Sequence, residues 1–217
     1  MRCLIFALGI SFSAAALAHN PYLADRCAAR SGTNCANAVL NRVNWARATL
    51  SYGEFTGTAM RHANLRAARA HGADMRRADL TRANLQQADL AAADLGQAIL
   101  RDARLTGANL RHARLREATL TQANLADAWL GYADLSQGRL CGANFSKASL
   151  HDAQLNDAEL QQAVFRAADL RNASLRGADL HGADFSHADL TNADLRGATL
   201  GNAVFFGART EGCRGCP

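Results

Sequence analysis

The chain has 217 residues, with 24 Lys and Arg against 19 Asp and Glu and a formal net charge of +5. Its longest apolar stretch, Leu4 to Leu17, is shorter than the roughly 20 residues that a membrane-spanning helix needs. No later stretch exceeds it, so the composition argues against a membrane-embedded protein.

Residues 1–18 have the pattern of a secretory signal peptide. Met1 and Arg2 precede the apolar stretch, which closes on Ala-Leu-Ala at 16–18, the small-residue pattern read by signal peptidase. We therefore expect cleavage after Ala18 and a soluble periplasmic or secreted protein that begins at His19.

Residues 19–37 are predicted to form an N-terminal cap. Cys27 and Cys35 flank a segment without repeats, Asp25 to Asn37, which we expect to fold as a short helix over the first unit of the next region. In an oxidising compartment a disulfide between these two cysteines is the default expectation.

A five-residue period fills residues 38–210. From Leu40 to Phe205 every fifth residue is Leu, Phe or Met except Trp45 and Ala70, and the residue two before it is Ala in most units, as in 83–85 and 88–90. Five residues advance a helix by about 500° and throw successive side chains of a strand onto opposite faces, so neither a plain helix nor a plain strand buries these leucines. A short extended piece followed by a corner does, and its repetition builds a solenoid.

The period resembles that of the pentapeptide repeat family, whose consensus is A(D/N)LXX. The resemblance implies an all-β fold, a right-handed quadrilateral β-helix with four pentapeptides in each coil. Residues 38–210 would then form about 8.5 coils, in a rod about 40 Å long at the usual strand spacing.

Residues 211–217 form a C-terminal tail with a CxxC motif at 213–216. We expect a structural disulfide between Cys213 and Cys216, with metal binding and redox chemistry as the alternatives, since the thioredoxin-like domain that usually carries a redox CxxC is missing. Cys141 is then the odd cysteine, either a free thiol at a corner or an intermolecular cross-link.

Residues twenty apart share one edge of the rod if each coil holds four units, so columns of side chains follow from the sequence. One edge collects Arg42, Arg61, His62, Arg82 and Arg101, and a second carries Arg76, Arg77 and Arg116. Guanidinium groups at such spacing can bind phosphate or carboxylate groups. The simpler interpretation is that corners must be polar and that arginine only makes them soluble.

Two further observations begin from the outward position between each Ala and Leu. Asn44, Asn64 and Asn84 fall in one column and predict a structural ladder of side-chain hydrogen bonds. Trp129 occupies another outward position and Tyr132 the next corner. Exposed aromatic residues are enriched at binding surfaces, so this pair is the second candidate site, with a lone surface aromatic as the alternative.

These features favour a non-enzymatic scaffold that binds a protein through its rigid surface, without a cofactor or metal, because a narrow filled solenoid offers no concavity and the seven histidines form no column. An anionic membrane surface or lipopolysaccharide, bound through the arginine edge, is the alternative. The resemblance also implies a DNA-mimic, gyrase-protecting role for some members, which suits neither the positive charge nor export, and no nucleic acid is expected as a partner. A homodimer through Val204, Phe205 and Phe206 remains open.

Overall fold

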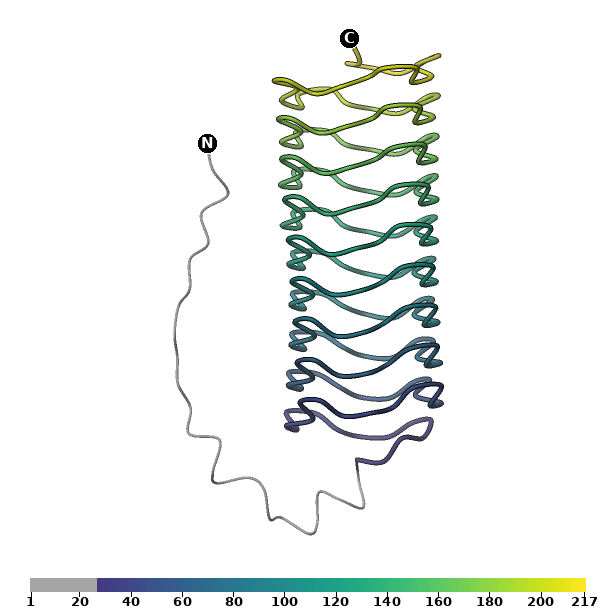
Figure 1. Cartoon of the computed structure of the whole chain (residues 1–217), viewed down its shortest axis with the longest axis vertical. Helices are drawn as coiled ribbons and strands as arrows, with labels where there is room; N and C mark the ends of the chain where they lie inside the picture. The colour runs from purple at the N-terminus through teal and green to yellow at the C-terminus, as the bar shows by residue number, and fades with distance from the viewer. Residues whose placement is uncertain (1–26) are drawn as a thin grey trace.

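The computed structural model describes residues 27–217, which form one straight rod of stacked coils (Figure 1). The described chain enters the rod at one end and leaves it at the other, winding without a detour. The predicted signal peptide and the first residues of the predicted cap lie outside the described residues.

Each coil takes twenty residues. Parallel β-bridges join every outward residue to the one twenty positions later, from Asn34 and Glu54 at one end to Asp194 and Arg214 at the other. The prediction of four five-residue units in each coil is therefore confirmed. Within residues 27–217 there is no helix, and every strand contact is a single-residue bridge followed by a turn.

The backbone of each unit is bound to its neighbours in a fixed pattern. In the unit centred on Leu80, its N–H donates to the carbonyl of Ile99 at 2.7 Å and that of Arg82 to the carbonyl of Arg101 at 2.8 Å. The N–H of Ala83 closes the turn by donating to the Leu80 carbonyl at 2.9 Å. Because the coils use up the backbone groups along the sides, strand edges are left only at the two ends of the rod.

Every corner turns in the same way. The second corner residue of each unit, from Gly32 to Gly212, has a positive φ between 53° and 75°. This geometry suits Gly, Asn and Asp, yet Arg, Gln, His and Ala also occupy the position, as at Arg42, His62 and Ala92. The stacked coils thus impose a left-handed backbone on residues that do not prefer it.

The core consists of alternating columns of alanine and larger apolar side chains. From Leu50 to Leu195 the central residues and the alanines are buried, including Ala70, which replaces a leucine. Phe145, Phe165, Phe185 and Phe205 stack face to face with ring centroids 4.9 to 5.0 Å apart. Dispersion between the stacked rings and the exclusion of water hold the coils together.

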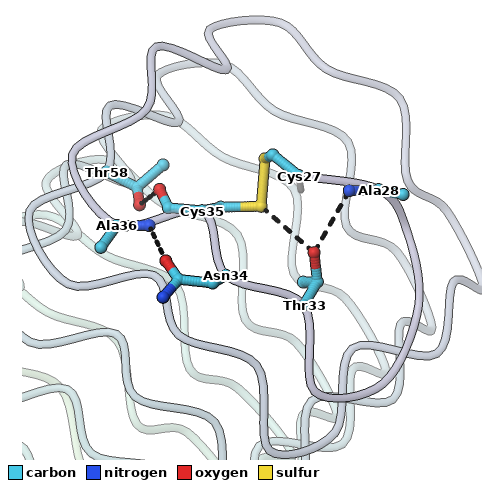
Figure 2. Close-up of a disulfide and its surroundings, with 7 residues drawn as sticks. All are labelled: Cys27, Ala28, Thr33, Asn34, Cys35, Ala36 and Thr58. Atoms are coloured by element: carbon cyan, nitrogen blue, oxygen red, sulfur yellow. Dashed lines mark hydrogen bonds between the residues drawn. A yellow bond between two sulfur atoms is a disulfide. The ribbon is translucent and has the colours of Figure 1, made fainter. Parts of the chain in front are cut away.

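The first coil begins earlier than predicted, and the helical cap is wrong. Asn34 already pairs with Glu54, and Cys35 takes the buried central position that Leu holds in later units. A Cys27–Cys35 disulfide ties the preceding residues to this coil (Figure 2). The reason that no helix forms is that residues 33–37 gain ladder hydrogen bonds to the second coil, which a helix would forfeit.

Two buried threonines replace alanine next to this disulfide. The Thr33 hydroxyl accepts the Ala28 N–H at 3.2 Å, and the Thr58 hydroxyl donates to the Cys35 carbonyl at 2.8 Å (Figure 2). Buried hydroxyl groups with such partners stabilise the first coil instead of weakening it.

The C-terminal residues also continue the solenoid. Arg214 bridges to Asp194, Cys213 takes the inward alanine position, and a Cys213–Cys216 disulfide closes the chain. Gly215 stands where Leu would stand, at φ +82°, and a Cβ there would lie 2.9 Å from the carbonyl group of Leu195. Only glycine lets the last backbone segment approach the coil below it so closely.

Candidate functional site

The arginine edge, defined as Arg42, Arg61, His62, Arg82 and Arg101, lies along one corner of the first four coils. The corner backbones are directly bonded, since the N–H of Arg42 donates to the Arg61 carbonyl and that of Arg82 to the Arg101 carbonyl, both at 2.8 Å. The edge thus presents its side chains on successive coils at the spacing of stacked strands, about 4.8 Å.

Only part of this edge is neutralised by neighbouring carboxylates. Arg61 pairs with Asp79 at 2.5 Å and Arg82 with Asp102 at 3.5 Å, and both guanidinium groups stay largely exposed. Arg42 and Arg101 have no ion pair within residues 27–217. The edge therefore retains positive charge that is open to an external anion.

The predicted asparagine ladder borders this edge on the adjoining side of the rod. The Asn64 side-chain amide donates to the Asn44 Oδ1 at 2.9 Å, and Asn84 continues the column through its bridge to Asn64. Each Oδ1 also accepts the backbone N–H two residues later, as from Arg66 to Asn64 at 3.3 Å. The asparagines shape the turn and leave amide N–H groups at the surface.

The second arginine column, Arg76, Arg77 and Arg116, surrounds a hollow of about 300 Å³ over Gly96. Each of its guanidinium groups already contacts a polar side chain. Arg76 holds Asp74 through two hydrogen bonds, and these lower the pKa of the Asp74 carboxyl below its ordinary value. Arg77 donates to Gln97 at 3.0 Å, and Arg116 donates to Gln137 at 2.7 Å and pairs with Glu117 at 3.7 Å, so every arginine of this column has a side-chain partner, unlike Arg42 and Arg101 of the edge.

The aromatic pair of Trp129 and Tyr132 is exposed, at 48% and 55%, but its rings already have partners. The guanidinium of Arg111 lies 4.5 Å from the Trp129 ring centre. His112 stacks on Tyr132 at 5.0 Å and His151 meets it edge-on at 5.2 Å. This ladder was not predicted from the sequence, although the twenty-residue spacing of His112 and Tyr132 indicates their contact.

The cysteines and the last coil complete the candidate residues. Cys141 is buried at a corner, where its Sγ lies 2.8 Å from the Gln161 Oε1. Val204 and Phe206 are exposed near the C-terminal end, and Phe205 is a partly buried continuation of the phenylalanine stack.

The ionisable groups with shifted pKa values serve the fold. A hydrogen bond from Arg171 holds the Asp169 pKa below its ordinary value, and one from Arg196 does the same for Asp194. A catalytic general acid needs the opposite shift, a carboxyl pKa raised toward neutrality. Within residues 27–217 no three side chains of the types that bind metals come together.

The comparisons with known proteins agree with this geometry. A family model for pentapeptide repeats matches eight copies over residues 31–66, 60–97, 98–137, 123–162, 158–197 and 183–213. No curated protein matches the chain. Within the described residues, no helix has the length and apolar character needed to cross a bilayer.

Three solved structures are similar. HetL, a pentapeptide repeat protein involved in heterocyst differentiation regulation in the cyanobacterium Nostoc, is 31% identical over 89% of this chain and 91% of its own, with a TM-score of 0.47. Trypsin-treated QnrB1, a plasmid-mediated fluoroquinolone resistance protein, is 20% identical over 74% and 86%, with a TM-score of 0.60. A pentapeptide repeat protein from the Arabidopsis thaliana thylakoid lumen is 25% identical over 51% and 78%, with a TM-score of 0.46. The chain therefore belongs to the pentapeptide repeat family, as shown by the twenty-residue coil, the buried columns of Ala and Leu, and the family match along the whole rod.

Proposed function

We propose that the protein is an exported, non-enzymatic scaffold that binds a partner protein through the arginine edge. The observation that carries this proposal is the set of arginines on successive, directly bonded coils, of which Arg42 and Arg101 have no ion pair within the described residues. A surface held rigid by the backbone loses little conformational freedom on binding.

Export is part of the proposal and rests on the sequence of residues 1–18 together with the disulfides. Two disulfides, Cys27–Cys35 and Cys213–Cys216, favour an oxidising compartment over a reducing cytosol. Intact-mass measurement of the protein recovered from periplasm or medium tests this part, and a chain that still contains Met1 would contradict it.

An anionic membrane surface or lipopolysaccharide is the second candidate partner. The same arginines would attract phosphate groups by a field that fades with ionic strength. Co-sedimentation with vesicles containing phosphatidylglycerol, repeated at low and high salt, separates this candidate from a protein partner held by close contacts.

A gyrase-protecting role is a third candidate, because QnrB1 has the same fold and is a fluoroquinolone resistance protein. Charge opposes it. Residues 19–118 contain 15 basic and 8 acidic side chains, the reverse of what a DNA mimic requires.

A homodimer through Val204, Phe205 and Phe206 is a further candidate. Light scattering of the Phe206→Asp variant is the test, and an unchanged oligomeric state would contradict the homodimer.

The decisive experiment is chemical cross-linking with mass spectrometry in native extracts. The test variant changes Arg42, Arg61, Arg82 and Arg101 to Glu. A matched control changes Arg166, Arg171, Arg176 and Arg196 to Glu, which alters the charge equally in the other half of the rod. We expect the partner captured by wild type to be lost only from the test variant. Equal capture of the partner by wild type and both variants would contradict the proposal.

A further inference from the structure

The arginine edge is one border of a wider cationic surface on the first four coils. The adjoining side of the rod has a second arginine border, Arg47 and Arg66, whose backbones are bonded at 2.8 Å. Between the borders lies the column of Asn44, Asn64, Asn84 and Arg104, joined by successive bridges. We call the edge arginines, this column and the second border together the Arg–Asn face.

Charge on the Arg–Asn face is almost entirely positive. Ion pairs bring only Asp79 and Asp102 to it, both at the arginine edge. Within residues 27–217 Arg47, Arg66 and Arg104 have no ion pair. The second border and the column are thus more fully cationic than the edge on which the proposed function rests.

The Arg–Asn face also offers donors and very few acceptors. Guanidinium groups only donate. The Oδ1 atoms of Asn64 and Asn84 accept the N–H groups of Arg66 and Gln86, at 3.3 and 3.2 Å. One N–H of the Asn64 amide donates to Asn44, and its other N–H and the amide group of Asn84 are left for a ligand. The backbone carbonyls of Arg61 and Arg66 are taken by the coil below. A ligand with many acceptor oxygens and few donors fits such a surface.

These properties select among the possible occupants. Single-stranded nucleic acid binds through aromatic stacking platforms and a membrane-surface helix inserts apolar side chains. The large exposed apolar residues of the described chain lie outside this face, although two of them flank its arginine edge; they are Tyr52, Trp129, Tyr132, Val204 and Phe206, and the flanking Val39 and Ile99. Acidic sugars bring many hydroxyl donors, which would find few acceptors here.

A second copy of the chain is a weaker occupant than its 11 acidic residues in 119–217 suggest, because five of these carboxylates already pair with an arginine. Asp169, Asp184, Asp189 and Asp194 each pair with an arginine of their own chain. A partner in which acidic residues follow one another supplies a denser complement to the Arg–Asn face than the remaining, separated carboxylates of a second copy.

We propose that the Arg–Asn face binds an extended acidic segment, rich in Asp and Glu, of the partner protein. The inference rests on the proposed function and names the chemistry of the partner. Carboxylates would meet guanidinium forks in the two-bond geometry that Arg171 and Asp169 already show, at 2.8 and 2.7 Å. Four coils span about 15 to 20 Å, the length of five or six extended residues.

The first test uses a fluorescein-labelled octaglutamate peptide and fluorescence polarisation at low salt. Asn84→Asp keeps an oxygen for the Gln86 N–H but replaces the donor with a negative charge. Asn124→Asp makes the same change in the same column two coils away, outside the face. We expect at least fivefold weaker binding for Asn84→Asp and less than twofold change for Asn124→Asp. Equal effects of the two variants, or no measurable binding by wild type, would overturn the inference.

The second test separates this inference from the proposed function. The double variant Arg47→Gln, Arg66→Gln leaves the arginine edge intact, and circular dichroism checks that it is folded. At least tenfold weaker octaglutamate binding is expected. Unchanged binding overturns the Arg–Asn face even if the arginine-edge variant loses the cross-linked partner, in which case the proposed function stands alone. Tighter binding of oligothymidylate, polygalacturonate or phosphatidylglycerol vesicles at equal charge and salt rejects the acidic peptide as the ligand.

Discussion

The two halves of the rod use the same repeat positions for different purposes. In residues 19–118 arginine predominates, and Arg42, Arg47, Arg66, Arg101 and Arg104 have no ion pair within the described residues. In residues 119–217 there are 8 basic and 11 acidic side chains, and arginine and aspartate lie together on corner and outward positions as bonded pairs. One fold thus provides both a cationic surface for a partner and a stack in which most arginines pair with carboxylates of the same chain.

The core differs between the halves as well. One column of central positions has Leu65, Leu85 and Leu105 in the first half and stacked Phe165 and Phe185 in the second. We expect Phe165→Ala to lower the free energy of unfolding by about 3 to 5 kcal/mol, since it removes two ring contacts and leaves a cavity. Leu85→Ala should cost about 2 to 5 kcal/mol. Urea denaturation followed by circular dichroism measures both, and a loss below about 1 kcal/mol for Phe165→Ala would contradict the role of the stack.

The second half should be the acid-sensitive part of the rod. Hydrogen bonds from Arg171 and Arg196 lower the pKa values of Asp169 and Asp194. For Asp184 burial alone would raise the pKa, but hydrogen bonds from Ser186 and Arg166 together outweigh it. Carboxyls with a pKa lowered on folding stabilise the protein above their unfolded pKa of about 3.9 and lose that contribution as the pH falls through their folded values.

Thermal melts from pH 7 to pH 2 check this expectation. The melting temperature should stay level down to about pH 5 and then fall, because the unfolded state takes up protons first. The double variant Arg171→Gln, Arg196→Gln should start lower at pH 7 and fall less steeply. Parallel curves for the variant and wild type would show that these pairs do not set the acid sensitivity.

The sequence predicted the architecture well because one local rule repeats along the chain. A repeated unit of an alanine, an outward residue and a large apolar residue predicts a solenoid. The resemblance to the pentapeptide repeat family implied the twenty-residue coil, and the arginine edge followed from that coil length. The repeat pattern gave no information at units where its residue types change. Cys35, Cys213 and Gly215 occupy alanine or leucine positions without resembling them, so the first and last units were mistaken for a cap and a tail.

The candidate site was less predictable for a different reason. Column membership follows from spacing, but the partner of each side chain depends on its rotamer and on neighbours in adjacent columns. Arg61 reaches across a corner to Asp79, and Arg111 turns onto Trp129, and neither contact is a twenty-residue pair. The spacing alone therefore predicted which arginines share an edge, but not which of them lack an ion pair.

A smaller effect separates the free arginines from the paired ones. Arg42→Gln with Arg101→Gln should change the free energy of unfolding by less than about 0.5 kcal/mol, because no ion pair of the described residues is broken and like charges are removed. Arg171→Gln with Arg196→Gln should destabilise the protein at pH 7, since each removes a two-bonded ion pair. Denaturant titrations of the two double variants make the comparison, and the opposite ranking would contradict the division of the rod into a binding half and a half in which most arginines are paired.

A small effect of the corner backbone should be equal in both halves, because it does not depend on the surface charges. Ala92 and Ala167 occupy the left-handed corner position at φ 55° and 53°, where a Cβ is unfavourable. Replacing either by glycine relieves that strain but gives the unfolded chain more freedom, and substitutions at positive φ show that the strain is the larger contribution. We expect Ala92→Gly and Ala167→Gly each to raise the free energy of unfolding by up to about 1 kcal/mol. A gain at one site and a loss at the other would mean that the corners are not equivalent, and that the difference between the halves reaches the backbone as well as the surface charges.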